Sequence, residues 1–218
     1  MKLTELLFSK AKETWDQATE KPFVIAMAKG TLSDDLYKRY QLQDYLYLQE
    51  YIGILNRIKE FSDSDEITGF LDAIINEVIE ELDHVHLPYL RKLGIKDEEI
   101  VANSELPVIR EYIGYMKGKV EEYGLIAGIT ALLQCSWGYA YIGRTMFEKH
   151  AEEISGSKYK MWFEAYTSEG YVSANNTWIE VLDKLGADIS EEETKTMTGI
   201  FTRCAQYEDE LWDALYQT

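Results

Sequence analysis

Hydrophobic residues recur every three or four positions along almost the whole chain, and polar residues fill the places between them. This spacing puts the apolar residues on one face of an α-helix, whereas a half-buried β-strand would place them at every second position. No stretch has the alternating, β-branched pattern of a strand. The pattern therefore predicts an all-α protein.

Prolines, glycines and capping residues mark the ends of the helices. Pro22 suits the first turn of a helix and Gly30 its end, while Ser33 and Ser190 are good N-caps. We expect about eight helices in a single domain spanning residues 1–218, because no repeat or low-complexity linker divides the chain. The expected helical ranges are 3–19, 22–29, 34–61, 64–86 (bent or restarted at Pro88, ended at Gly94), 107 to 118 or 123, 125–150, 159–185 and from 190 to the C-terminus, with one short helical turn at 96–102.

The composition is that of a globular protein, with 46% hydrophobic and 28% charged residues. A formal net charge of −17 argues against partners such as nucleic acid or an anionic membrane surface, since both need clustered Lys and Arg. Cys135 and Cys204 do not make a disulfide framework in a chain of this size. The N-terminus has no signal-peptide pattern, and no apolar run approaches the roughly 18 residues of a membrane span. We therefore expect a cytoplasmic protein.

A cysteine lies in the middle of the apolar and aromatic stretch ALLQCSWGYAYIG, residues 131–143. Helical spacing puts Leu132, Cys135, Tyr139 and Ile142 on one stripe, so the thiol points in the same direction as the Tyr139 ring, into packed protein. A free cysteine in such a place is commonly a small buried hydrophobe. A catalytic nucleophile is the other interpretation, and it depends on what the remaining helices supply.

An acid stands among tyrosines in the long helix that follows Ser33. Tyr40, Asp44, Tyr47 and Tyr51 share one helix face. A buried carboxylate must be hydrogen-bonded or its pKa must rise, because burying it unpaired costs several kcal/mol. Asp44 is either a core fastener that accepts tyrosine hydroxyls or a functional acid.

Glu208 is the corresponding charged residue on an apolar face of the last helix. It interrupts an apolar stripe that includes Phe201, Cys204 and Leu211, and it could simply be a partly exposed acid at a helix seam. Two acids and a thiol on three inner faces, in a chain with 16 tyrosines, together indicate a pocket for a flat, polar, aromatic ligand.

Glu81 and His84 form an E-x-x-H pair, the repeating unit of di-iron carboxylate bundles. Such bundles need two pairs, and the sequence contains one. His84 is more often a hydrogen-bonding or salt-bridged residue than a metal ligand. We expect no metal and no cofactor.

Six segments, in order along nearly the whole chain, resemble motifs of the TenA family, also called thiaminase II or aminopyrimidine aminohydrolase. They are YQLQDYLYLQEY, EELDHVHLP, IREYIGYM, ALLQCSWGYAYIG, YKMWFEAYTSEGY and AQYEDELW. The resemblance implies a heme-oxygenase-like fold, a homotetramer and membership of the branch that retains the cysteine. It also implies a set of site residues: Cys135 as nucleophile, Glu208 as acid/base, Asp44 as pyrimidine-binding acid, and Tyr47, Tyr112, Tyr139 and Tyr166 around the ring.

Two positions depart from the family pattern. Gln134 replaces the usual proline before the cysteine, and Leu211 replaces an aromatic residue near Glu208. These departures bear on the exact substrate more than on the reaction class. The implied reaction converts 4-amino-5-aminomethyl-2-methylpyrimidine, thiamin, or both to 4-amino-5-hydroxymethyl-2-methylpyrimidine. A di-iron oxygenase and a non-catalytic pyrimidine-binding or regulatory protein remain alternatives, and the roles of Asp44 and Glu208 could be exchanged.

Overall fold

The computed structural model describes residues 1–217, which form ten α-helices and one π-helical turn and contain no strand. The all-α prediction is confirmed. In chain order the elements are α1 (Leu3–Thr19), α2 (Pro22–Ala28), α3 (Asp34–Lys59), α4 (Asp65–Glu81), η1 (Leu82–His86), α5 (Leu87–Lys92), α6 (Asp97–Ala102), α7 (Pro107–Gly156), α8 (Lys160–Thr167), α9 (Glu169–Leu185) and α10 (Glu191–Tyr216).

The capping residues recognised in the sequence act as predicted. The Ser33 hydroxyl accepts a hydrogen bond from the backbone N–H of Leu36 at 3.3 Å and so begins α3. At the start of α10, Ser190 and Glu193 bond reciprocally: the Glu193 N–H donates to the Ser190 hydroxyl at 3.2 Å, and the Ser190 N–H donates to the Glu193 carboxylate at 2.8 Å. Gly30, with φ of 68°, follows the end of α2.

One predicted helix is divided in the structure. The range 159–185 was expected to be continuous, but Ser168 has extended backbone angles between α8 and α9. Its hydroxyl accepts a hydrogen bond from the N–H of Tyr171 at 3.2 Å, which makes it the N-cap of α9. The opposite happens earlier in the chain: the predicted ranges 107 to 118 or 123 and 125–150 form one continuous helix, α7, and the expected break between them is wrong. Gly124 lies within α7 with a φ of 68°, which glycine tolerates without the steric penalty of other residues.

The chain forms two compact units. Unit 1 contains residues 1–32 and 129–217, and unit 2 contains Ser33–Gly128. Helix α7 contributes its first part to unit 2 and its second part to unit 1. The expectation of a single domain stays a prediction.

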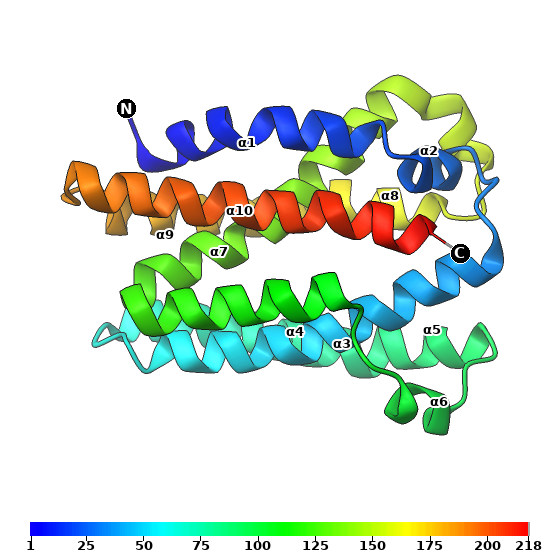
Figure 1. Ribbon diagram of the computed structural model, residues 1–218, viewed down its shortest axis with the longest axis horizontal. Helices are drawn as coiled ribbons and strands as arrows, with labels where there is room; N and C mark the ends of the chain where they lie inside the picture. The colour runs from blue at the N-terminus through cyan, green and yellow to red at the C-terminus, as the bar shows by residue number, and fades with distance from the viewer. Residues whose placement is uncertain (218) are drawn as a thin grey trace. The chain divides into compact units, whose positions relative to one another are not determined.

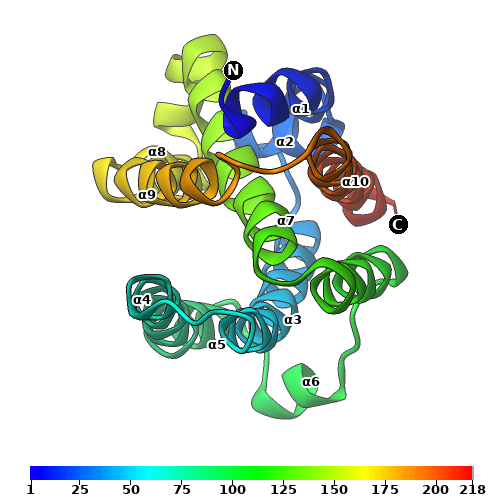
Figure 2. The same ribbon diagram turned by 90° about the vertical axis from the view of Figure 1, so that its left-hand side faces the viewer.

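Unit 2 is built on α3 and α4, which are antiparallel neighbours joined by a short loop (Figures 1 and 2). Their apolar faces bury Leu55 and Ile58 of α3 with Leu71 of α4. Helix α7 approaches α3 closely at Gly128, where an added Cβ would lie 2.3 Å from Ile58 Cγ1. This position therefore needs glycine for packing.

Unit 1 contains α1 and α10 side by side (Figure 1), with Trp15 and Phe201 buried among their apolar faces. The second half of α10 also packs on α2. There Lys21 Nζ lies 2.8 Å from Asp209 Oδ2 and 2.7 Å from Asp213 Oδ2. These contacts hold the part of α10 that carries Glu208.

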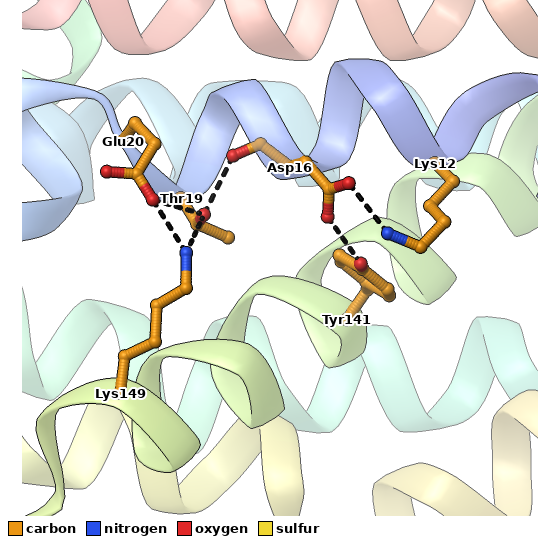
Figure 3. Close-up of polar contacts among 6 residues, drawn as sticks. All are labelled: Lys12, Asp16, Thr19, Glu20, Tyr141 and Lys149. Carbon is orange, nitrogen blue, oxygen red and sulfur yellow. Dashed lines mark hydrogen bonds and ion pairs between the residues drawn. The ribbon is translucent and has the colours of Figure 1, made fainter.

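A polar network joins α1 to the part of α7 that follows Cys135 (Figure 3). The Tyr141 hydroxyl donates to Asp16 Oδ1 at 2.5 Å, and Lys149 Nζ donates to Glu20 Oε1 at 2.6 Å. Burial raises the pKa of Asp16, but hydrogen bonds from Lys12 and Tyr141 outweigh it, so the net pKa lies below its ordinary value. Asp16 is therefore a carboxylate that helps to fix α7 on α1.

Helix α7 is also the one described helix with the length and composition to cross a membrane, which differs from the expectation that no apolar run of the chain approaches a membrane span. Its most apolar 18 residues have a mean hydropathy of 1.3, and 67% of that window is buried in the protein. The core helix of a globular protein passes the same test of length and composition.

Candidate functional site

Three of the predicted site residues lie together in unit 2. Helix α3 presents the predicted stripe, in which Tyr40, Tyr47 and Tyr51 are buried and the Asp44 side chain is 11% exposed. The Tyr112 ring, from the first part of α7, stacks on Tyr47 with centroids 5.7 Å apart and planes inclined by 19°. Asp44 therefore lies on a helix face that is walled by aromatic rings.

The Asp44 carboxylate faces a histidine and another acid. His86 Nε2 lies 3.5 Å from Asp44 Oδ2 and 3.3 Å from Glu81 Oε1. Burial is the main cause that raises the pKa of Asp44 to about 6; the negative charge of Glu81 adds to this effect, and the charge on His86 opposes it. Asp44 is thus an acid whose pKa lies close to neutrality, a common property of groups that transfer protons.

His86 is a residue that sequence reasoning missed. The E-x-x-H spacing singled out His84, but His84 is exposed and Glu81 contacts the buried His86 instead. The reason is η1, because its π-helical turn contains one residue more than an α-helical turn and so brings residues five apart onto one face. Pro88 was the available signal, since a proline within a helix disturbs the turn that precedes it. Among residues 1–217, no group of three or more His, Cys, Asp or Glu side chains is arranged to hold a metal ion.

The other four predicted residues lie in unit 1, on α7, α8 and α10. The Tyr139 ring on α7 contacts the Tyr166 ring on α8, with centroids 4.9 Å apart, and the Trp212 ring on α10 at 5.7 Å. Trp162 closes this aromatic cluster, 4.7 Å from Tyr166. The cluster joins α7, α8 and α10, the three helices that carry Cys135, Tyr166 and Glu208.

Cys135 and Glu208 both adjoin this cluster. Cys135 precedes Tyr139 by four residues and Glu208 precedes Trp212 by four, so each lies one helical turn, about 6 Å along the axis, from the Tyr139–Trp212 contact. Glu208 is 6% exposed and Cys135 is half-buried, whereas Cys204 is completely buried. Of the two thiols, the partly accessible one is the one that the sequence predicted as nucleophile.

The two departures from the family pattern are accommodated within the helices. Gln134 is fully buried in α7, which continues without a break through the position where the family has proline. Leu211 is buried in the inner stripe of α10, as predicted.

Unit 1 also has a cavity of about 330 Å³ that is separate from the predicted residues. It is bordered by aromatic, aliphatic and polar side chains: Phe8, Trp137, Ala140, Tyr141, Arg144, Thr167, Val172, Asn175, Asn176 and Ile179. None of the seven predicted site residues borders it, so its size alone does not make it the candidate site.

Comparison with known proteins places this all-helical chain in a defined class. Over 99% of its length, and 92% of the other chain, it superimposes on a domain of unknown function with a heme oxygenase-like fold from Shewanella denitrificans OS217, with a TM-score of 0.78 at 16% identity. The predicted heme-oxygenase-like fold is confirmed.

Residues 8–218 match the model of the TENA/THI-4/PQQC family, and the chain belongs to that family. It is 27% identical over 228 residues to an aminopyrimidine aminohydrolase of Helicobacter pylori, covering 100% of both chains. It is 28% identical over 224 residues to an aminopyrimidine aminohydrolase of Halalkalibacterium halodurans, covering 99% of this chain and 96% of the relative. The resemblance deduced from the six segments is confirmed.

Proposed function

We propose that this protein hydrolyses an aminopyrimidine, namely 4-amino-5-aminomethyl-2-methylpyrimidine, thiamin, or both, to 4-amino-5-hydroxymethyl-2-methylpyrimidine in thiamin salvage. The names of the full-length relatives support this activity. The observation that carries the proposal is the position of Cys135 and Glu208, each one turn from the Tyr139–Trp212 ring contact. Binding alone would not require a thiol there.

The substrate carries an amine or thiazolium group on a methylene carbon, and direct displacement of that group is difficult. In the proposed reaction the Cys135 thiolate forms a C–S bond to the pyrimidine ring, which ends its aromaticity. The electron pair returned by the ring then breaks the bond to the leaving group, and a carboxyl group supplies the proton that an amine needs to depart. Water adds to the exocyclic carbon and loses a proton to the carboxylate. The C–S bond breaks, which restores the aromatic ring and the thiolate.

Glu208 is assigned the transfer of the proton to the leaving group. Asp44 is assigned the contact with the ring nitrogen of the pyrimidine. The buried position of Glu208 beside the aromatic cluster supports its assignment. For Asp44, the supporting feature is the ring of Tyr47 on the same face of α3, which is stacked on Tyr112. The four predicted tyrosines stack on the ring or hydrogen-bond to it. General acid–base catalysis by such a carboxyl group typically contributes about 10²–10⁴-fold.

Incubation of the purified protein with each substrate, followed by chromatographic detection of hydroxymethylpyrimidine, tests this function. Product from the aminomethylpyrimidine or from thiamin supports the proposal and identifies the preferred substrate. Binding of hydroxymethylpyrimidine without turnover of either compound would instead indicate a pyrimidine-binding protein. Iron at one or two equivalents per chain would favour the oxygenase alternative.

The family resemblance also leads us to propose a cytoplasmic homotetramer. Several large apolar side chains that a partner subunit could cover are exposed on the single chain, among them Val85, Val101 and Met161. Light scattering should then give a mass of about 101 kDa, four times the 25.3 kDa of one chain.

A further inference from the structure

We propose that His86 is a positioning residue, presented by the π-helical turn η1, which directs the proton of Asp44 to the ring nitrogen of the bound pyrimidine. The substrate in this inference rests on the function proposed above. The link between His86 and Asp44 rests on the structure of unit 2 alone.

The geometry gives His86 access to Asp44 through η1. The imidazole is 5% exposed, and its Nε2 lies 3.5 Å from Asp44 Oδ2 and 3.3 Å from Glu81 Oε1. A single Nε2–H cannot make two full hydrogen bonds, so its proton can be directed either to Glu81 or to Asp44. Nδ1 is buried and has no hydrogen-bond partner among residues 1–217. The contacts of this ring with carboxylates are therefore made through Nε2.

The charged groups around Asp44 have opposite effects on its protonation. Of the elements packed on α3, η1 contributes His86 and the end of α4 contributes Glu81, while Arg91 of α5 is paired with Asp97 at 3.0 Å. Burial and Glu81 both favour the protonated form of Asp44, and His86 favours the carboxylate. Burial also lowers the pKa of His86, but its hydrogen bond to Glu81 and the charge of Asp44 outweigh this, so the net pKa lies above its ordinary value.

This arrangement matters because an aminopyrimidine and a carboxyl group share one proton when they pair. The carboxyl group accepts a hydrogen bond from the exocyclic amine and faces the ring nitrogen with its other oxygen. If the proton stays on Asp44, the ring remains neutral. If it moves to the ring nitrogen, the ring becomes electron-poor and accepts the Cys135 thiolate more readily. By favouring the carboxylate, His86 moves the proton towards the ring.

Loss of His86 should therefore lower turnover more than binding. His86→Gln keeps an amide donor near the position of Nε2 but cannot become charged. We expect kcat to fall about tenfold or more, because a change of one pKa unit in Asp44 changes the equilibrium for proton transfer to the ring about tenfold. The Kd for hydroxymethylpyrimidine should change by less than about threefold. His84→Gln is the matched control, because His84 lies in the same turn and is exposed.

A second measurement tests the link without substrate or turnover. The chain has three histidines, so the imidazole signals can be assigned and titrated by NMR. The midpoint of His86 should fall in Asp44→Asn, because the negative charge that helps to raise the pKa of His86 is removed. It should be unchanged in Asp83→Asn, an exposed acid within η1.

The two measurements separate this inference from the proposed function. An unchanged His86 midpoint in folded Asp44→Asn would overturn the inference, and so would equal kcat values for His86→Gln and the wild-type protein. If the wild-type protein turns over neither substrate, the proposed function fails, and the NMR titration still decides whether His86 is coupled to Asp44. A lowered midpoint together with a selective loss of kcat supports the inference.

Discussion

Asp44→Asn should make the protein more stable at neutral pH while abolishing turnover. The pKa of Asp44 is about 6 in the folded protein, against 3.8 for an unperturbed aspartate. The folded state therefore binds more protons than the unfolded state between these two values. The free energy of unfolding therefore falls as the pH rises through this window, and the full destabilisation by the buried Asp44 carboxylate is present above about pH 6. Asparagine has no charge at any pH and does not incur this cost.

The size of the effect follows from the shift, because the Asp44 side chain is only 11% exposed. A shift of about two units corresponds to about 3 kcal/mol at pH 8, and roughly half of this destabilisation is already present at pH 5. Urea denaturation of the wild-type and Asp44→Asn proteins at both pH values measures the difference, with protein concentration held fixed because the proposed association of subunits would contribute to stability. Asp83→Asn, an exposed acid in η1, is the control.

We expect Asp44→Asn to be the more stable protein at both pH values, and its advantage in unfolding free energy to be roughly 1–2 kcal/mol larger at pH 8 than at pH 5. An asparagine variant that is less stable than wild type at pH 8 would contradict this prediction, because the Asp44 carboxylate would then stabilise the core through its hydrogen bonds. A difference that does not change with pH would also refute it.

Three further substitutions test other parts of the account. Cys135→Ser should fold normally and lose turnover, since a hydroxyl supplies almost no anion near neutrality, whereas Cys204→Ser should be nearly silent in the same assay. Glu208→Gln should retain affinity for hydroxymethylpyrimidine in calorimetry but lose about two orders of magnitude or more in kcat; unchanged turnover with a lower Tm would make Glu208 structural. Gly128→Ala should cost about 1–3 kcal/mol in urea denaturation because its Cβ would collide with a packed side chain of α3, whereas Gly114→Ala, with no neighbour within 4 Å, should not destabilise the protein.

Helix type and most helix ends could be predicted because their causes are local. The capping hydroxyls of Ser33 and Ser190 bond to residues three positions away, and Gly30 ends its helix through its own backbone angles. The break at Ser168 is equally local, and its serine and the following Glu169 were a signal that the apolar pattern on both sides concealed. Local signals of this kind are visible in one sequence.

The residues around Asp44 could be predicted only in part. Its place among tyrosines follows from helical spacing, and the structure confirms that face of α3. The partner histidine depends on η1, which changes the register by one residue and exchanges the exposed His84 for the buried His86. The register of a helix that contains a π-turn depends on tertiary packing as well as on its own residues, so spacing rules for an ideal α-helix selected the wrong histidine.

Hydrolysis in water enriched in oxygen-18 shows whether the protein replaces the leaving group of the pyrimidine with an oxygen from water. The proposed reaction adds water to the exocyclic carbon after Cys135 has added to the ring, so the oxygen of the product comes from solvent. Mass spectrometry should show hydroxymethylpyrimidine heavier by about two mass units with the wild-type protein, at a rate that Cys135→Ser lowers by several orders of magnitude. Formation of no labelled product above the protein-free rate, from either the aminomethylpyrimidine or thiamin, would contradict the account.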